Sequence, residues 1–241
     1  MPPRRRSVLL SKLVIENQGS PQREILDELR RVILDGAVPP GTAIPLGEVA
    51  ELFGVSHIPV RESLKTLIGE GLVDHRANLG YTVAQLTSAE LREIYIVRET
   101  LETAALSAAA EQATAEDRAE IAGIHARMED AIRDDDPVAY HRLSREFHLA
   151  LTRPSRMYRL LHMLESAWNM TEPVQPMVHV ARGDRATLHS DHQAMLDAFL
   201  ANDVARLLAA SEHHHKRLNT VIATLPTDTG LLAAEDISLR K

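Results

Sequence analysis

The sequence predicts a mainly α-helical protein in two parts: a small N-terminal module that ends in a β-hairpin, and a longer all-α antiparallel bundle. Three observations support this prediction. The 241 residues are more than one typical domain and fewer than three. Aromatic residues make up only 3% of a chain rich in Ala, Leu and charged residues, which favours helices. Turn-forming residues cluster before residue 85, whereas every strong segment from Ser88 onward has helical spacing.

The elements of the N-terminal module follow from its helix caps and chain breakers. A helix is predicted after Ser20-Pro21, because Ser is a good cap and Pro suits the first helical position. Pro39-Pro40-Gly41 is a hard break. Two further helices are predicted over 46–53 and 56–69, followed by a hairpin over 72–84. Residues 1–19, which include Arg4–Arg6, show no clear period and are expected to form a flexible basic arm.

The rest of the chain is predicted to be a bundle of about six helices. The expected helices cover 88–112, 115–134, 137–152, 155–169, 185–201 and 204–223. The predicted organisation is therefore an arm over 1–19, a small module of helices and a hairpin over 20–84, a bundle over 85–225 and a loose tail over 226–241.

Composition excludes several classes of protein. No apolar run reaches the roughly 18–20 residues of a membrane span, and the short apolar part of the N-terminus is broken by Lys12. We therefore expect no membrane segment, no signal peptide and a cytoplasmic location. The absence of cysteine excludes disulfide scaffolds, thiolate zinc sites and cysteine nucleophiles.

The third predicted helix has the pattern of a DNA recognition helix. Three helices and a hairpin in about 65 residues are the layout of a winged helix-turn-helix. Ser56 is expected to cap this helix. Its core-facing stripe is predicted to be Val60, Leu64, Leu67 and Ile68. The opposite face carries His57, Arg61 and Lys65, and the wing adds His75, Arg76 and Asn78. Such donors can reach phosphates and base edges; the alternative is that Arg61 and Lys65 are simply solvated.

Histidine is the outlier of the composition, because the 12 histidines exceed the 8 aromatic residues and ten of them follow residue 84. Apolar spacing places three of them on inner faces of three separate helices: His148, His192 and His214. Convergence on one divalent metal would satisfy all three rings. The alternatives are three separate core histidines, or a metal-free pocket that binds an organic effector. His213 and His215 are rotated by about 100° to either side of His214 and are expected to be more exposed.

The stretch GVSHIPVRESLKTLIGEGLVDHRANLGYTVAQL resembles the DNA-binding module of the GntR family of bacterial transcription regulators. By this resemblance, DNA-contact or near-contact positions are Ser56, His57, Pro59, Arg61 and Gly80, to which the residue pattern adds Lys65 and Arg76. His57 stands where the family usually has Arg, and Ile58 where many members have Thr. The resemblance therefore implies DNA binding but not an operator sequence.

The segments EIYIVRETLETAAL, LSREFHLAL, SDHQAML and NDVARLLAASEHHHKR resemble the FCD effector domain of FadR-like GntR regulators. In metal-binding members a D-x-x-x-H pattern supplies two ligands, and each of two later helices supplies a histidine. The histidine positions match His148, His192 and His214, whereas the Asp position is Ser144. Arg98 matches the family's recurrent Arg in the first effector helix, which implies an anchor for an anionic effector. The alternative for Arg98 is a salt bridge with Glu102.

The sequence thus predicts a metabolite-responsive transcription regulator, expected to be a repressor and a homodimer. Its expected partners are operator DNA and a carboxylate-bearing metabolite, and its expected cofactor is a divalent metal such as Zn²⁺ or Ni²⁺. Residues 1–84 hold 10 Lys+Arg and 10 Asp+Glu, so the overall charge of −7 belongs to the bundle and does not argue against DNA binding.

Two other functions compete with this prediction. A metal-dependent hydrolase would use a His-bound water, but the sequence places no identifiable Glu or Asp base beside the three histidines. A DNA-binding architectural protein without an effector would not explain a long bundle with inward-facing histidines.

Overall fold

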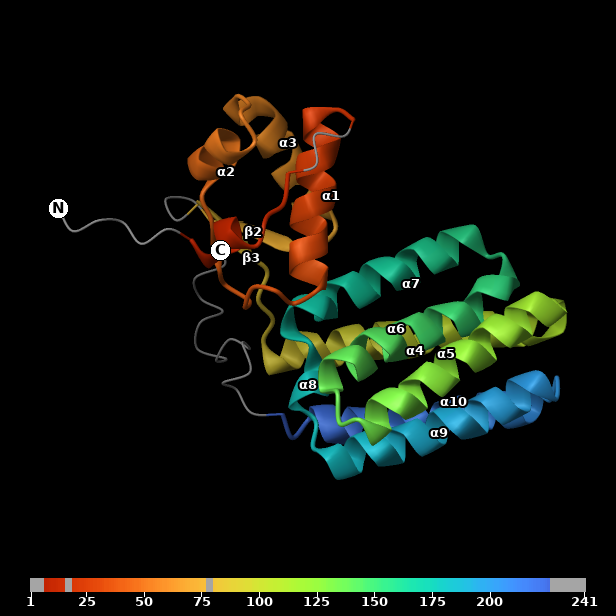
Figure 1. Ribbon diagram of the computed structural model, residues 1–241. Helices are drawn as coiled ribbons and strands as arrows, with labels where there is room; N and C mark the ends of the chain where they lie inside the picture. Colours follow the sequence, from red (N-terminus) through yellow and green to blue (C-terminus); the bar gives the residue numbers. More distant parts are fainter. Residues whose placement is uncertain (1–6, 16–18, 77–79, 226–241) are drawn as a thin grey trace. The chain divides into compact units, whose positions relative to one another are not determined.

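The computed structural model describes residues 7–15, 19–76 and 80–225. They divide into two compact units, whose elements are labelled in Figure 1. Of the described residues, the first unit contains those up to Ser88 together with Asn169–Val174, and the second contains Ala89–Trp168 and residues 175–225. Arg4–Arg6, Asn78 and the expected tail from residue 226 lie outside the described residues.

The first unit has the predicted three helices and hairpin. Its elements are a 3-10 helix at Val8–Ser11, α1 (Pro21–Leu34), β1 (Ala43–Ile44), α2 (Leu46–Leu52), α3 (His57–Gly69), β2 (Val73–Arg76) and β3 (Gly80–Val83). The strands form an antiparallel sheet in the order β1-β3-β2. The sequence did not predict β1, because two residues are too short to show an alternating pattern.

The start of α1 is as predicted, whereas α3 differs from the prediction in two details. The Ser20 hydroxyl accepts a hydrogen bond from the Arg23 N–H at 3.4 Å. Ser56 makes no such bond at α3 and is exposed, so its predicted capping role is wrong. Ile68 is 38% exposed and does not complete the buried stripe. Ser63 lies inside instead, and its hydroxyl donates to the Gln22 carbonyl at 2.9 Å, which ties α3 to α1.

Residues 7–15, expected within a flexible arm, are packed against the first unit. Leu9 is fully buried in its core. The Ser7 hydroxyl donates to the carbonyl oxygen of Ala43 at 2.6 Å, and the Val14 N–H donates to Glu28 at 2.6 Å. The expectation of a flexible arm is therefore wrong for this stretch. A single 3-10 turn with one core residue leaves no period in the sequence.

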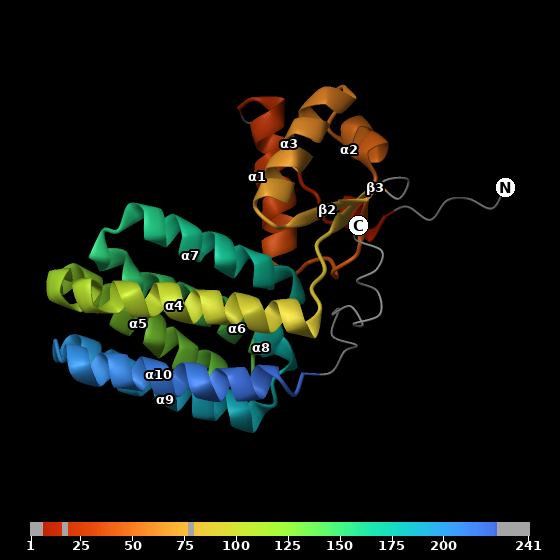
Figure 2. The same cartoon turned by 180° about the vertical axis from the view of Figure 1, so that it is seen from behind.

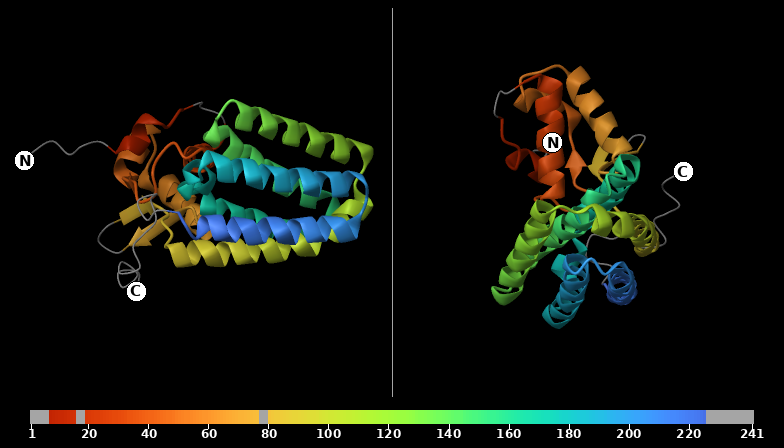
Figure 3. Two further views of the ribbon diagram at one scale, coloured as in Figure 1. Left: turned by 90° about the horizontal axis from the view of Figure 1, so that it is seen from below. Right: turned by 90° about the vertical axis from the view of Figure 1, so that its right-hand side faces the viewer.

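The second unit is the predicted helical bundle, in which consecutive helices run back and forth (Figures 2 and 3). Its helices are α4 (Ser88–Gln112), α5 (Ala115–Arg133), α6 (Pro137–Thr152), α7 (Tyr158–Thr171), α8 (Pro176–His179), α9 (Arg182–Leu200) and α10 (Val204–Ile222). The helix pairs α5–α6, α5–α9 and α9–α10 pack against each other. None of the described helices is both long enough and apolar enough to cross a bilayer.

One buried arginine fixes α9 against the turn between α5 and α6. Arg185 is 7% exposed, and its guanidinium donates to Asp135 at 2.8 Å and to the Val180 carbonyl at 2.6 Å. Asp135 has a φ of 51°, a left-handed conformation that Asp tolerates better than most residues. This contact sets the placement of α9, and hence of its histidines, relative to α6.

Replacement of Leu9 tests whether the N-terminal segment is part of the core. Leu9→Ala removes buried methyl groups and is expected to destabilise the first unit by about 2–5 kcal/mol. Amide hydrogen exchange of α1–α3 in the full-length protein measures this loss. The matched control is Val8→Ala, because Val8 is 58% exposed. Equal exchange rates in the two variants would show that the segment does not stabilise the unit.

Candidate functional site

Three histidines from three helices meet inside the bundle. His148 on α6, His192 on α9 and His214 on α10 are each at most 2% exposed. The Nε2 atoms of His148 and His192 are 3.1 Å apart, and the ring centroids of His192 and His214 are 4.4 Å apart. One ligand atom from each ring lies within 4.8 Å of those from the other two. The described residues thus contain a histidine cluster with the dimensions of a metal site.

A polar group stands behind each of these three rings. The partners are Glu102 for His148 Nδ1 at 2.8 Å, the Tyr140 hydroxyl for His192 Nδ1 at 3.3 Å and Asp191 for His214 Nδ1 at 3.8 Å. Such partners orient imidazole ligands, because the nitrogen that faces them is turned away from the metal. The sequence did not identify an acidic residue beside the three histidines, whereas the structure places Glu102 and Asp191 there.

Burial keeps the three rings uncharged. Desolvation lowers the pKa of His148 and of His192, and it lowers the pKa of His214 to about 3. Neither ring nitrogen of His214 has a hydrogen-bond partner among the described residues. An unsatisfied buried polar group costs about 1–3 kcal/mol. A neutral imidazole with one ring nitrogen available is the form that binds a metal ion.

His215 is also buried, contrary to the prediction that it is exposed. It is 2% exposed, and its Nε2 lies 3.2 Å from Glu102, whereas the side chain of His213 is 64% exposed as predicted. Burial alone would raise the pKa of Glu102, but contacts with His148 and His215 outweigh it and hold that pKa well below its usual range. Burial likewise opposes the charged form of His215, but the Glu102 carboxylate raises its pKa overall. Glu102, His148 and His215 form a second group that could hold a metal ion.

Arg98 is buried beside the same cluster. It is 2% exposed and lies between two aromatic rings, with Cζ 3.1 Å from the centroid of Trp168 and 4.4 Å from that of Tyr95. Its Nε is 4.0 Å from Glu102 and has no hydrogen-bond partner among the described residues. Arg98 thus lies near Glu102 and also lines the cavity, and its role as an effector anchor stays a prediction.

The cavity enclosed by these side chains is small. The residues that line it include Arg98, Ser144, Trp168 and the three clustered histidines, together with Tyr95, His141, Met177, Leu188 and Leu218. The centre of a water-sized sphere can move through only about 10 Å³, which is room for about one water molecule. The cavity can hold a single ion or water, whereas a larger effector requires lining side chains to move.

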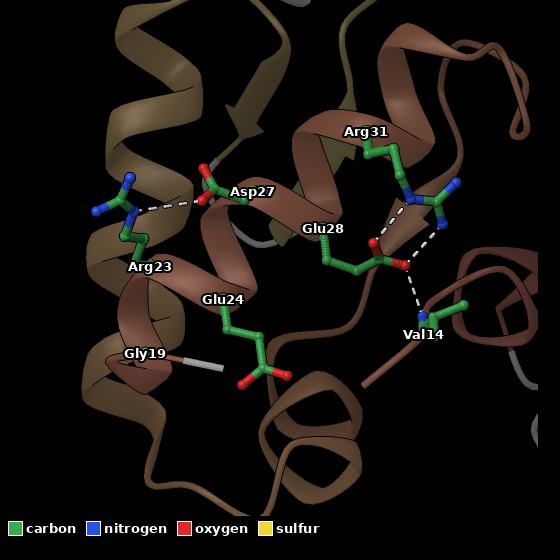
Figure 4. Close-up of a pocket in the computed structure, with 7 residues that line it drawn as sticks. All are labelled: Val14, Gly19, Arg23, Glu24, Asp27, Glu28 and Arg31. Carbon is green, nitrogen blue, oxygen red and sulfur yellow. Dashed lines mark hydrogen bonds and ion pairs between the residues drawn. The ribbon is translucent and has the colours of Figure 1, made fainter. Parts of the chain in front are cut away.

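Two other features of the described residues are less suited to binding a ligand. The rings of His125 and His189 stack at 4.5 Å, and burial lowers the pKa of His189 to about 4, but neither belongs to a metal-competent group. Figure 4 shows an open groove along α1. Its charged side chains already pair with each other, Arg31 with Glu28 at 2.7 Å and Arg23 with Asp27 at 3.6 Å.

The expected DNA-contact residues lie on α3 and on the wing. Ser56, His57, Arg61 and Lys65 are exposed, while Pro59, Arg76 and Gly80 are partly buried. Arg61 makes no ion pair with a described residue, whereas Lys65 pairs with Glu62 at 2.9 Å. Gly80 begins β3 with a φ of +84°, a conformation that favours glycine at the end of the wing turn. Arg61 is thus the α3 cation whose charge is most available to a partner.

A winged helix-turn-helix followed by a helical unit with a small, histidine-lined cavity defines a class, the DNA-binding transcriptional regulators with a separate effector domain. Family models agree with this class. "Bacterial regulatory proteins, gntR family" matches residues 21–83, and "FCD domain" matches residues 93–217, more than half of the chain. The chain belongs to the GntR family of regulators and carries an FCD domain.

Known relatives are regulators as well. The HTH-type transcriptional regulator McbR of Escherichia coli is 29% identical over 145 residues, which are 60% of this chain and 66% of that protein. The "Probable D-xylose utilization operon transcriptional repressor" of Paenarthrobacter nicotinovorans is 27% identical over 79% of this chain and 84% of its own length. Solved structures of E. coli McbR/YncC and of a GntR regulator from Rhodococcus sp. RHA1 share the fold. Their TM-scores are 0.73 and 0.74 and their identities 23% and 22%, over 85% of this chain and 98% of theirs in both cases.

Membership in this family decides between the general functions that the sequence left open. GntR regulators bind operator DNA, and FCD domains bind small-molecule effectors. These proteins are transcriptional regulators and not enzymes, so the metal-dependent hydrolase is the wrong alternative, even though Glu102 lies beside His148.

The depressed pKa of His214 predicts how stability depends on pH in the metal-free protein. The folded pKa is about 3, against 6.5 for an ordinary histidine. Between these values the unfolded chain binds a proton that folded His214 does not. As the pH falls from about 6.5 toward about 3, the contribution of His214 to the free energy of unfolding therefore decreases by up to about 1.4 kcal/mol per pH unit. His214→Gln should flatten that slope in urea unfolding of chelator-treated protein.

The control for this measurement is His213→Gln, which replaces the exposed neighbour and should leave the slope as it is in the unmodified protein. A slope that is equally steep in the His214→Gln variant would contradict the neutral, buried state of His214.

Proposed function

We propose that this protein is a metabolite-responsive transcriptional repressor that acts as a homodimer. We propose further that its effector site combines a divalent metal ion at His148, His192 and His214 with the guanidinium of Arg98. The observation that carries this proposal is the convergence of three buried, neutral imidazoles beside a buried cation on one enclosed cavity. Such a concentration of costly polar groups in a core favours a binding function over a purely structural one.

The donor set suits a borderline metal such as Zn²⁺, Ni²⁺ or Co²⁺, because all three expected ligands are neutral imidazole nitrogens. The unpartnered nitrogens of His214 support the same proposal, since a cation would satisfy them. Ser144 lines the cavity on the same helix as His148 and would offer a hydroxyl or hold a water where related motifs carry a carboxylate. When bound, the metal would supply a Lewis-acidic centre with positions open to an anionic ligand.

The proposed effector is a small carboxylate-bearing metabolite. A metal held by neutral ligands leaves positive charge inside the bundle, and Arg98 adds a cation that Glu102 approaches only to 4.0 Å. An anion would balance both charges. Because the cavity has room for about one water, an organic effector must displace side chains that line it. Binding would therefore favour a different arrangement of the bundle helices, which is what a population shift requires.

On the DNA side, we propose that α3 lies in the major groove with Arg61 as its main cationic contact. Ser56, His57, Pro59 and Lys65 would add to that contact from α3, and Arg76 and Gly80 from the wing. The exposure of Arg61 and the absence of an ion pair to a described residue support its role.

A homodimer presents two such helices, and tethering makes the second contact effectively intramolecular. The action as a repressor is suggested by relatives with that name. We expect the protein to act in the cytoplasm, where bacterial operator DNA lies.

Metal loading tests the effector site. The protein, treated with chelator and reloaded with Zn²⁺ or Ni²⁺, should bind one ion per chain by native mass spectrometry and elemental analysis. His148→Ala, His192→Ala and His214→Ala should each weaken binding by at least the roughly 10–100-fold that loss of an orienting partner costs. The control is His125→Ala, because His125 is a buried bundle histidine outside the cluster. No bound metal, or equal binding by all variants, would favour a metal-free pocket in which the histidines contact the effector directly.

Arg61→Ala tests the DNA-binding face. The DNA duplex for this test is selected from random DNA by the unmodified protein. Loss of the Arg61 donor should weaken binding to that duplex by about 1–3 kcal/mol, or roughly 10–100-fold. It should also reduce the dependence of affinity on salt. The control is Arg133→Ala, since Arg133 is an exposed arginine of the bundle. An unchanged affinity in a dimeric Arg61→Ala variant would refute the assignment of α3.

A further inference from the structure

One buried carboxylate joins the two halves of the proposed effector site. Glu102 on α4 is 1% exposed. Its Oε2 lies 2.8 Å from Nδ1 of His148 on α6 and 3.2 Å from Nε2 of His215 on α10. Its Oε1 accepts a hydrogen bond from the indole N–H of Trp168 on α7 at 3.2 Å. A single side chain thus connects four helices around the cavity.

The Oε2 side of this contact determines how His148 is protonated. An ionised carboxylate can only accept hydrogen bonds, so Nδ1 of His148 must carry the hydrogen that it donates to Glu102. In a neutral ring, Nε2 then has its lone pair free. This Nε2 is the atom that lies 3.1 Å from Nε2 of His192 and faces the rest of the histidine cluster. Glu102 therefore directs the metal-binding nitrogen of His148 toward the site.

The Oε1 side of the contact determines where Arg98 lies. Trp168 donates to Oε1 and covers the Arg98 guanidinium, whose Cζ is 3.1 Å from the indole ring centroid. The Nε of Arg98 approaches the same oxygen to 4.0 Å. Removal of the carboxylate would leave Arg98 without its nearest counter-ion and Trp168 without its hydrogen-bond acceptor. Both the cation and its aromatic cover thus depend on Glu102.

A second metal ion at Glu102, His148 and His215 is the competing explanation of this cluster. It is supported by His215, whose Nδ1 lies 2.8 Å from the Ser211 carbonyl and must donate to it, which leaves Nε2 facing Glu102. One observation opposes it. His148 already lies at hydrogen-bond distance from Oε2 through Nδ1, so that this oxygen is engaged by a ring N–H and not open to a second ion.

We propose that Glu102 is a positioning residue that prepares both halves of the effector site. It holds His148 with Nε2 free for the metal, and it holds Trp168 and Arg98 in place for the anion. This inference rests on the proposed metal site but assigns a role to a side chain that lies outside the expected ligand set.

The substitution that tests this role is Glu102→Gln, which keeps the shape of the side chain and removes its charge. One acceptor oxygen becomes an NH₂ donor, so glutamine cannot accept from Trp168 and from His148 at the same time. If the NH₂ faces His148, that ring must accept at Nδ1 and carry its hydrogen on Nε2, where it blocks the metal. The matched control is Glu99→Gln, the same change one turn earlier on α4, at a partly buried residue that contacts Asn219.

The first measurement is the dissociation constant of Co²⁺ in the full-length dimer, from its visible absorption spectrum in competition with a chelator. Glu102→Gln should raise this constant by roughly 10–100-fold, as expected for loss of an orienting partner, while Glu99→Gln should leave it unchanged. Equal affinities in the Glu102→Gln variant and the unmodified protein would overturn the proposal. Two Co²⁺ ions per unmodified chain would overturn it in favour of the second metal site.

The second measurement needs no metal. Long-range ¹H–¹⁵N NMR of the metal-free protein shows which ring nitrogen of His148 carries hydrogen; we expect Nδ1, and Nε2 in the Glu102→Gln variant. Hydrogen on Nε2 of His148 in the unmodified protein would overturn the positioning role. If the unmodified protein shows the expected form but binds no Co²⁺, the proposed metal site fails while the control of His148 by Glu102 stands.

Discussion

The cost of burying polar groups is the constraint on which the bundle depends. An ion or imidazole taken out of water costs several kcal/mol unless a partner replaces the lost hydration. The bundle nevertheless buries Glu102, Arg98 and a group of histidines together. Glu102 compensates most of this cost, because it contacts a ring on α6, a ring on α10 and the indole of α7. His214 is compensated least among the three clustered histidines, because neither of its ring nitrogens is hydrogen-bonded to a described residue and its Nδ1 approaches Asp191 only to 3.8 Å.

The two parts of the chain use charge for different purposes. The first 84 residues are neutral overall, with exposed basic residues such as Arg61 on α3, while the remaining 157 carry the whole excess of −7. A neutral module has modest non-specific affinity for DNA, so specific contacts and pairing of two modules would have to supply the rest. In the bundle the important charges are instead buried, and their balance is local to the cavity. A ligand that changes this balance acts on helix packing, which is how an effector signal would begin.

The sequence was sufficient to predict the elements that have a clear period, and the residues that those periods place inward. Helical spacing located the helices and set His148, His192 and His214 on inner faces. It did not show His215 or Glu102 as parts of the site. Helical spacing indicates on which face of a helix a residue lies, but not how wide the buried stripe is or which residue of a neighbouring helix it contacts. A buried α4 face that already contained Arg98 was the available signal for Glu102, four residues later. Leu9 and β1 were missed because one turn and two residues have no period.

We propose that the buried histidines are a metal site completed by this network of partners. X-ray diffraction from crystals of the full-length protein loaded with Ni²⁺ or Zn²⁺, recorded on both sides of the metal absorption edge, would locate the ion. We expect one anomalous peak per chain, within about 2.0–2.2 Å of nitrogens of His148, His192 and His214, with Nδ1 of His148 still on Glu102. A peak at Glu102 and His215, or no peak inside the bundle, would refute a metal site at the three histidines.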